Sequence, residues 1–145
     1  MSDLERAMDT LSSHSICLCK GGAVLTDDGR GISPMMKFLA EGRDLSGYSA
    51  ADQIVGKAVA MLFLKAGICA VYGKVMSIAA KTLLESRGIP VRCDTLTERI
   101  INRQGTGICP MEEAVAHTDD IDTAYALLRE KLRALQAQKA HINLQ

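Results

Sequence analysis

Apolar residues near the N-terminus are first spaced as in a helix and then alternate as in strands. Apolar side chains at positions 4, 7, 8 and 11 predict a short helix over residues 2–12. Residues 15–20 alternate, which predicts a strand. Gly21-Gly22 is typical of a two-residue hairpin turn, so residues 23–26 are expected to return as the antiparallel partner strand.

The longest apolar stretch lies inside a segment for which we predict one long helix, Ser49–Gly67. Ser49 is followed three residues later by Asp52, which is capping-box spacing, and Gly67 is typical of a helix C-terminus. Residues 58–64 are all apolar, so this part is expected to be buried on several sides. The first half of the segment is polar or small, which makes it a candidate site: Asp52, Gln53, Gly56 and Lys57.

The segments on both sides of this helix predict an alternation of helices and buried strands. Pro34 at a first helical position predicts a short helix over residues 33–41. Further along, we predict a strand over residues 68–76, a helix over 77–87 and a strand over 89–93. Such a crossover makes its two strands parallel. With the hairpin, this indicates an α/β fold: a three-layer mixed sheet of four or five strands with helices on both faces.

The C-terminal third of the chain is predicted to be helical. A Thr-x-x-Glu capping box predicts a short helix over residues 95–101, and Pro110 starts another. The longest helix is expected over residues 118–137, with an apolar stripe that packs on the domain or on a second subunit in a homodimer. Residues 138–145 are expected to fray. No repeat or shift in composition divides the chain, so we expect one domain.

The composition excludes several classes of partner. The 145 residues suffice for one hydrophobic core, and 48% apolar with 23% charged residues is ordinary for a globular protein. Seventeen Lys and Arg balance seventeen Asp and Glu, aromatic residues are 3%, and there is no Trp. Neither a nucleic acid nor a membrane is therefore expected as a partner.

The cysteines and histidines indicate reduced thiols without a metal centre. The five cysteines include no C-x-x-C pair, and no secretory signal is visible, so we expect a cytoplasmic protein. No two of the three histidines have helical ligand spacing, and we expect no metal and no cofactor. Cys17 and Cys19 share one face of a strand and could share a metal, but packing beneath a helix is the stronger interpretation.

Cys109 is the first candidate for chemistry. It precedes the helix that Pro110 starts, where the helix dipole and free N–H groups would stabilise a thiolate nucleophile. Gly105 and Gly107 would let the backbone approach a ligand. The alternative is a small buried residue beside a turn. Glu112, in the first turn of that helix, either caps its own helix or assists the site.

The polar start of the Ser49–Gly67 helix is the second candidate. Glycine inside a helix costs about 1 kcal/mol relative to alanine, so Gly56 could serve the close approach of another backbone or of a ligand. Lys57 borders an apolar run and must reach solvent or pair. In the alternative, Asp52 is merely a helix cap. A third candidate is an anion site in the following loop, although an exposed loop is the simpler interpretation: Asn102, Arg103 and Thr106.

Three collinear stretches resemble a known family. ADQIVGKAVAMLFLKAG, VYGKVMS and NRQGTGICPMEEAV are similar to an uncharacterised bacterial family known as domain of unknown function eighteen-ninety-three. The resemblance covers about residues 14–130. It implies a cytidine-deaminase-like fold, in which a hairpin precedes a helix–strand–helix–strand unit.

The same resemblance implies a scaffold without its usual zinc chemistry. Cytidine deaminases begin the buried helix with H-x-E or C-x-E and a later helix with P-C-x-x-C, and these residues hold zinc and transfer protons. The corresponding places hold Asp52-Gln53-Ile54 or Val55-Gly56-Lys57, and then Ser77-Ile78-Ala79-Ala80. Zinc-dependent deamination is therefore not expected. What remains is a candidate cleft between the two helix starts, over which the Cys109 loop could close.

Three functions are compatible with these patterns. The first is a non-hydrolytic binding or sensor protein for a small anionic or nucleotide-like ligand, because helix N-termini favour anions. Its expected site is Asp52, Gly56, Lys57, Ser77, Arg103, Thr106 and Glu112. The second is an enzyme that uses Cys109 as nucleophile, helped by Asp52, Lys57 or Glu112. The third is a partner-binding scaffold that dimerises through its long C-terminal helix.

Overall fold

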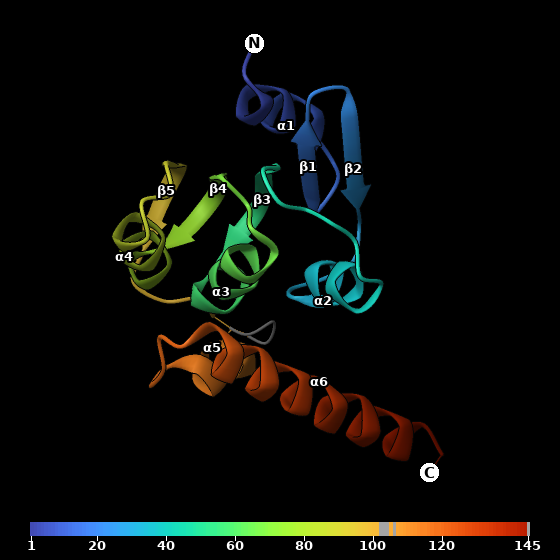
Figure 1. The fold of residues 1–145 in the computed structure, drawn as a ribbon. Helices are drawn as coiled ribbons and strands as arrows, with labels where there is room; N and C mark the ends of the chain where they lie inside the picture. The colour runs from blue at the N-terminus through green and yellow to red at the C-terminus, as the bar shows by residue number, and fades with distance from the viewer. Residues whose placement is uncertain (102–104, 106, 145) are drawn as a thin grey trace.

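The computed structural model describes residues 1–101, 105 and 107–144. Its sheet comprises β1 (Ile16–Lys20), β2 (Ala23–Asp27), β3 (Ser49–Val55), β4 (Ala70–Ser77) and β5 (Val91–Thr97). The strand order is β2-β1-β3-β4-β5. β1 is antiparallel to both β2 and β3, whereas β3, β4 and β5 run parallel. The fold is therefore the predicted α/β architecture with a mixed sheet of five strands (Figure 1).

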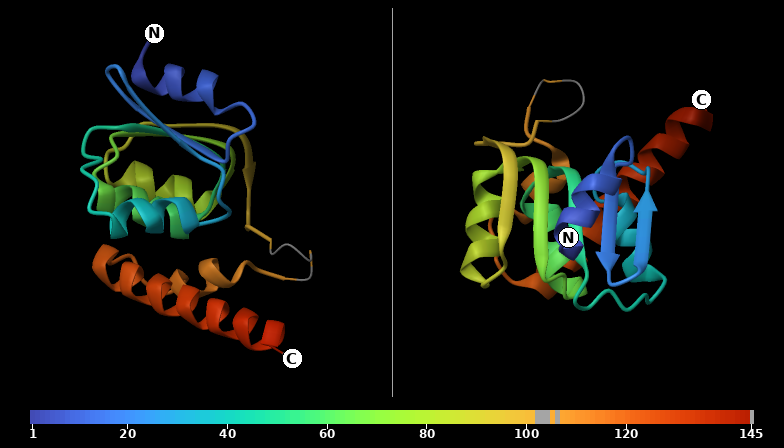
Figure 2. Two further views of the ribbon diagram at one scale, coloured as in Figure 1. Left: turned by 90° about the vertical axis from the view of Figure 1, so that its right-hand side faces the viewer. Right: turned by 90° about the horizontal axis from the view of Figure 1, so that it is seen from above.

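Helices cover both faces of this sheet. They are α1 (Asp3–Leu11), α2 (Ser33–Ala40), α3 (Lys57–Ala66), α4 (Ile78–Ser86), α5 (Pro110–Val115) and α6 (Ile121–Leu144). Figure 2 shows α1 on one face and α2, α3 and α4 on the other, with α5 and α6 on the outer side of these three helices. The far half of α6 extends beyond the body of the protein (Figure 1).

The segment Ser49–Gly67 is a strand followed by a helix, so the prediction of one long helix is wrong. β3 takes its first seven residues, Gly56 is the N-cap of α3, and Gly67 ends α3 with a φ of 80°. Capping-box spacing and alanines favour a helix locally. Between β1 and β4, however, hydrogen bonds and packing on both sides outweigh these weak local preferences. Ala50 and Ala51 are fully buried, which lets neighbouring elements approach both faces of the strand.

Two apolar cores lie on the two sides of the sheet. The larger one is formed by the sheet and α2–α4, and it extends to Val115 of α5 and to Ala124 and Leu128 of α6. The smaller one lies beneath α1. α3 carries buried residues around its whole circumference because the sheet covers one side and α5 and α6 cover the other. The buried, all-apolar helix predicted for residues 58–64 is thus confirmed.

Two further boundaries differ from the predictions. Residues 95–101 contain no α-helix, because β5 continues to Thr97 alongside β4. α6 runs from Ile121 to Leu144, so residues 138–144 are helical where fraying was predicted. Within the described residues, no helix is both long enough and apolar enough to cross a membrane.

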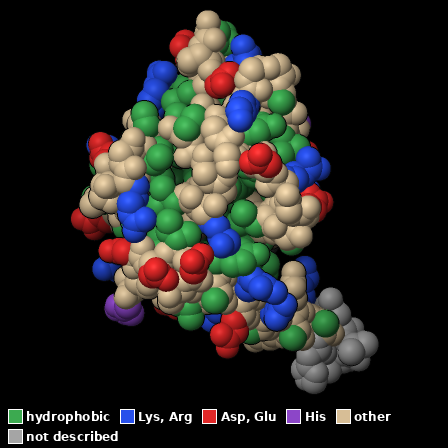
Figure 3. Space-filling model, in the orientation of Figure 1, with side chains coloured by type: hydrophobic (Ala, Val, Ile, Leu, Met, Phe, Trp, Pro, Cys, Tyr) green, Lys and Arg blue, Asp and Glu red, His purple; other side chains and the backbone are tan. Residues whose placement is uncertain are grey.

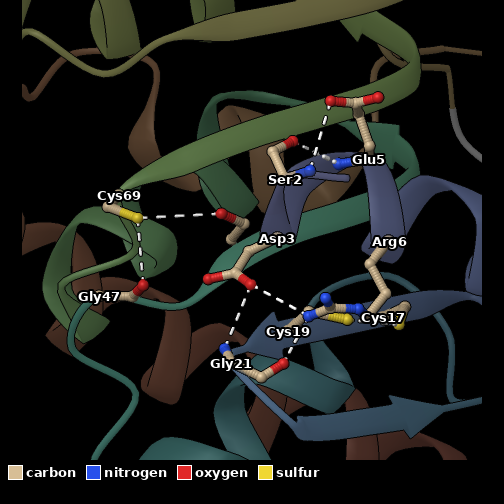
Figure 4. Close-up of polar contacts among 10 residues, drawn as sticks. Ser2, Asp3, Glu5, Arg6, Cys17, Cys19, Gly21, Gly47 and Cys69 are labelled. Atoms are coloured by element: carbon tan, nitrogen blue, oxygen red, sulfur yellow. Dashed lines mark hydrogen bonds and ion pairs between the residues drawn. The ribbon is translucent and has the colours of Figure 1, made fainter.

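The N-terminal helix is fixed over β1 by polar contacts at its first turn (Figure 4). The Asp3 carboxylate accepts the N–H of Gly21 in the hairpin turn at 3.2 Å and pairs with Arg6 at 3.1 Å. Beneath the helix, the Cys17 and Cys19 sulfurs lie 3.9 Å apart and are fully buried. Burial, together with Cys19, raises the pKa of the Cys17 thiol to about 12, which disfavours a nucleophilic thiolate at Cys17.

Candidate functional site

The candidate site lies where the parallel strands end and two helices begin. β3 leads through Gly56 into α3, and β4 leads directly into α4 at Ser77. Beyond β5 the chain turns back, and the bridge between Ile101 and Ile108 brings α5 to this edge of the sheet. Ligands of parallel α/β sheets bind outside the carboxyl ends of the strands, so this edge is where a site is expected.

The start of α3 is occupied by a carboxylate from a distant part of the chain. Glu112 of α5 accepts the N–H of Lys57 at Oε1 and the N–H of Ala58 at Oε2, each at 2.7 Å. The N-cap residue Gly56 has no side chain that could do this. Glu112 had been expected either to cap its own helix or to assist a site. The structure instead makes it the cap of another helix, fifty-five residues away from Lys57.

The contact between Glu112 and the start of α3 requires glycine at position 56 because a larger residue would not fit, and not because of the backbone conformation. The Gly56 φ of −97° is accessible to any residue. A Cβ atom at this position would lie 2.1 Å from Glu112 Oε1 and 2.9 Å from Ile100 Cγ1. The glycine therefore leaves the volume into which the carboxylate fits. The sequence predicted a close approach of another backbone or a ligand at Gly56, and the group that the structure places there is the Glu112 side chain.

Opposing effects act on the protonation of Glu112. Burial raises its pKa above the usual value, while the two N–H donors and the positive charge of Lys57 partly offset that effect. The Lys57 ammonium lies 2.9 Å from Asp119 Oδ1, between α5 and α6, and that contact lowers the pKa of exposed Asp119. Lys57 thus both pairs with an acid and keeps positive charge beside Glu112.

The start of α4 is capped locally. Ser77 is buried, and its hydroxyl oxygen accepts the N–H of Ala80 at 3.1 Å. This is the usual N-cap arrangement, with donor and acceptor three residues apart. Because Ser77 satisfies one N–H group only, the first turn of α4 still presents backbone donors toward the space in front of it.

A cavity of about 210 Å³ lies between these two helix starts. Its polar lining residues are Lys57, Ser77, Glu98, Arg99 and Glu112, and its apolar ones are Ala79, Ile100, Ile108 and Ala116. The sequence-based search missed Arg99 and did not assign Glu98 to a site. Their signal was a charged pair directly after β5, and the erroneous helix predicted over residues 95–101 concealed it.

The structure brings together some of the predicted site residues and separates others. Lys57, Ser77 and Glu112 line the cavity, and Gly56 lies against Glu112 and Ile100 of this lining. Asp52 does not line it. This residue lies within β3 between its register partners Ile16 and Gly73, is 8% exposed, and accepts the N–H of Ile54 at 3.2 Å. Burial raises the pKa of Asp52 to about 7.

The predicted nucleophile Cys109 lies near the cavity edge of the sheet but not in the cavity lining, and part of the predicted anion site lies outside the described residues. Cys109 is the N-cap residue of α5, and its backbone N–H donates to the carbonyl of Ile100 at 3.0 Å. It is not among the residues that line the cavity. Arg103 and Thr106 lie outside the described residues.

The face shown in Figure 3 has no large area of one charge, and the described residues contain no cluster of metal ligands. In Figure 3, basic and acidic side chains are interspersed over the visible face, without a large area of one sign. In residues 1–101, 105 and 107–144, no group of three or more His, Cys, Asp or Glu side chains is placed to hold a metal ion.

Comparison with known proteins assigns the chain to a family. The model of the domain of unknown function DUF1893 matches residues 7–132. The chain belongs to the DUF1893 family. Among solved structures, this DUF1893 chain is similar to that of a DUF1893 family protein from Thermotoga maritima, with a TM-score of 0.78 and 24% sequence identity. The match covers 92% of this chain and 91% of the other, and at this identity it establishes the fold. None of the curated proteins matches.

Proposed function

We propose that this DUF1893 protein binds a small anionic ligand, such as a phosphate ester or nucleotide, in the cavity between the starts of α3 and α4. It would act as a binding or sensor protein and not as a zinc hydrolase. The observation that carries the proposal is the Glu112 carboxylate, which two backbone N–H groups hold at 2.7 Å beside the cavity. Backbone N–H groups at this edge of the sheet thus already hold one carboxylate, and the first turn of the neighbouring α4 offers similar donors.

The charges around the cavity support an anionic rather than a neutral ligand. Lys57 and Arg99 contribute cationic side chains to the lining, and Ser77 places a hydroxyl group at the start of α4. Glu98 and Glu112 are also in the lining. The two N–H donors and Lys57 already interact with Glu112, so Arg99, which has no ion-pair partner among the described residues, and the first turn of α4 are the groups that would receive a ligand.

The proposal also includes a cytidine-deaminase-like scaffold that lacks zinc chemistry. Its support is the family membership together with the residues at the two helix starts. Gly56-Lys57-Ala58 opens α3, and Ser77-Ile78-Ala79-Ala80 opens α4, where the deaminase pattern requires His or Cys ligands and a glutamate. Neither segment contains a thiol or an imidazole. Stoichiometric zinc in the purified protein, measured by elemental analysis, would contradict this part of the proposal.

The binding proposal is tested by thermal unfolding with inorganic phosphate, nucleoside monophosphates and short dicarboxylates. A ligand present at 100 times its dissociation constant adds about 2.7 kcal/mol to the free energy of unfolding, which a melting curve resolves easily. Arg99→Ala should weaken binding of the effective probe at least tenfold. Lys81→Ala is the matched control, because Lys81 pairs with Glu85 on α4 and does not line the cavity.

Two results would contradict the proposal. One is the absence of stabilisation by every probe of the panel. The other is stabilisation that Arg99→Ala and Lys81→Ala reduce equally, since that would indicate non-specific binding of anions to the surface.

A further inference from the structure

β5 is an edge strand whose outer backbone groups have no partner within the described part of the chain. The N–H of Val71 on β4 donates to the carbonyl of Pro90 at 3.0 Å, and Val71 is the register partner of Val91. Successive residues of a strand direct their backbone groups to opposite edges. The N–H and C=O groups of Val91, Cys93 and Thr95 therefore point away from the sheet, where they can pair with another strand.

The two edges of the sheet are not equivalent. At the other edge, residues 43–45 and Tyr48 of the loop before β3 lie beside Ala23–Leu25 of β2, and together they line one hollow. Lys37 of α2 also pairs with Asp27 at the end of β2. β5 has no such neighbour among the described residues, and its side chains from Asp94 to Leu96 are exposed. It is thus an edge at which another strand can be added, with fewer neighbouring groups among the described residues than β2 has.

The charges on β5 favour a second copy of the strand as partner and disfavour two of the possible registers. Two antiparallel copies of β5 can form backbone hydrogen bonds only if outward-pointing residues face each other, so the two-fold axis must pass beside a single residue. An axis at Asp94 would oppose two aspartates, and an axis at Arg92 would oppose two arginines, both of which are unfavourable. An axis at Cys93 places each Arg92 opposite the partner's Asp94. These pairs are of the non-hydrogen-bonded type, in which side chains lie closest.

We propose that two copies of this chain associate through β5, antiparallel about a two-fold axis at Cys93, so that the two sheets form one continuous sheet. Each copy contributes Arg92 and Asp94 to two identical ion pairs across the axis. This surface is different from the apolar stripe of α6, through which a dimer was expected from the sequence.

A local contact orients Asp94 for this pairing, and Arg92 has no ion-pair partner among the described residues. The Tyr72 hydroxyl donates to Asp94 Oδ2 at 2.7 Å, which orients the carboxylate and leaves its other oxygen free. Within the described residues, neither Arg92 nor Asp94 takes part in an ion pair. Val91 and Cys93 remain packed against the main core, so the strand can pair without moving.

Charge reversal tests this arrangement. Sedimentation velocity over a wide range of concentrations should show a monomer–dimer equilibrium for the unmodified chain. Arg92→Asp places two carboxylates opposite each other at both cross-strand pairs and should weaken the dimer at least tenfold. The double variant Arg92→Asp with Asp94→Arg restores opposite charges at both pairs and should recover dimerisation. Circular dichroism establishes that each variant is folded. Lys81→Ala serves as a charge-loss control away from the strand.

Disulfide cross-linking tests the register independently of folding effects. Opposed Cys93 residues would have Cα atoms about 5.5 Å apart, which is within the range of disulfides. Diamide, which takes up the two hydrogen atoms of the thiols, should link Cys93 to the partner's Cys93 in a variant whose exposed Cys69 is replaced by serine. An axis at Thr95 would instead place Cys93 opposite threonine and give no such link.

The outcomes divide clearly. A dimer that Arg92→Asp weakens, that the double variant restores and that cross-links at Cys93 supports the proposal. A chain that is monomeric at all concentrations overturns it, as does a dimer that is unaffected by Arg92→Asp.

Discussion

Asp52 is a buried carboxylate and Glu112 a half-buried one in the same small domain, and their surroundings differ. Glu112 lies at the start of α3, where two N–H donors and Lys57 support its negative charge. Asp52 lies within β3, where it accepts N–H groups of its own strand but forms no ion pair with any residue that the structure describes. Burial raises the pKa of both. For Asp52, where fewer interactions oppose the effect of burial, the pKa reaches about 7.

This difference shows what a helix start contributes. The free N–H groups of a helix start carry partial positive charge and point in the same direction. In a strand, most N–H groups are already engaged in hydrogen bonds to the neighbouring strands. A buried carboxylate on a strand is therefore tolerated partly as the neutral acid. Ser77 adds a third case, because it caps α4 without any charge.

The largest effect is expected for the pH dependence that Asp52 causes. Because its pKa rises from 3.8 in the unfolded chain to about 7, its contribution to stability is full below about pH 4 and is lost as the pH rises to about 7. At about 1.4 kcal/mol for each factor of ten in proton affinity, this amounts to about 4 kcal/mol at most. Asp52→Asn should abolish this dependence in chemical denaturation between pH 4 and pH 8.

Asp9→Asn, an exposed substitution on α1, is the control and should keep the pH profile of the unmodified chain. Identical profiles for Asp52→Asn and the unmodified chain would show that Asp52 is already ionised in the folded protein.

The next largest effect is expected for Gly56→Ala. The added Cβ would lie 2.1 Å from Glu112 Oε1, so the carboxylate must leave the start of α3 and Ile100 must shift. Overpacking together with the lost charged hydrogen bonds should reduce the free energy of unfolding by about 3 kcal/mol. Gly22→Ala is the control, since nothing lies within 4 Å of its added Cβ. Equal denaturation midpoints for the two variants would contradict this role of Gly56.

Removal of the carboxylate itself should have a smaller effect. Glu112→Ala leaves the N–H groups of Lys57 and Ala58 without their acceptor, and hydrogen bonds to a charged group contribute about 1.5–3 kcal/mol, so we expect a loss of about 2 kcal/mol. Amide hydrogen exchange should accelerate at these two positions. Glu113→Ala, on the exposed side of α5, should change neither quantity.

Ser77→Ala should have the smallest effect, about 1 kcal/mol, because it removes one neutral N-cap bond. Exchange should accelerate at Ala80 and remain unchanged at Lys57. A loss as large as that of Glu112→Ala would mean that the charge of Glu112 contributes nothing beyond a neutral cap at the start of α3.

Local sequence signals identified those parts of the fold whose causes are local. The Gly21-Gly22 turn, the apolar run of α3, its left-handed cap at Gly67 and Pro110 at the first position of α5 were all predicted, and the structure confirms them. In each case the deciding interactions join residues a few positions apart. Gly56, Lys57, Ser77 and Glu112 were also identified individually as candidate site residues.

Tertiary structure decided the remainder. Ser49–Val55 became a strand because β1 and β4 offered hydrogen-bonding edges on both sides, which outweighed local signals for a helix. The correction moved Asp52 from a helix start into the sheet and left Gly56 as the N-cap of α3. The partner of that N-cap, Glu112, comes from fifty-five residues beyond Lys57. A pattern of residue spacing cannot predict a contact over this sequence distance. The contact forms because the chain returns to this edge of the sheet after β5 and because Gly56 has no Cβ to occupy the space.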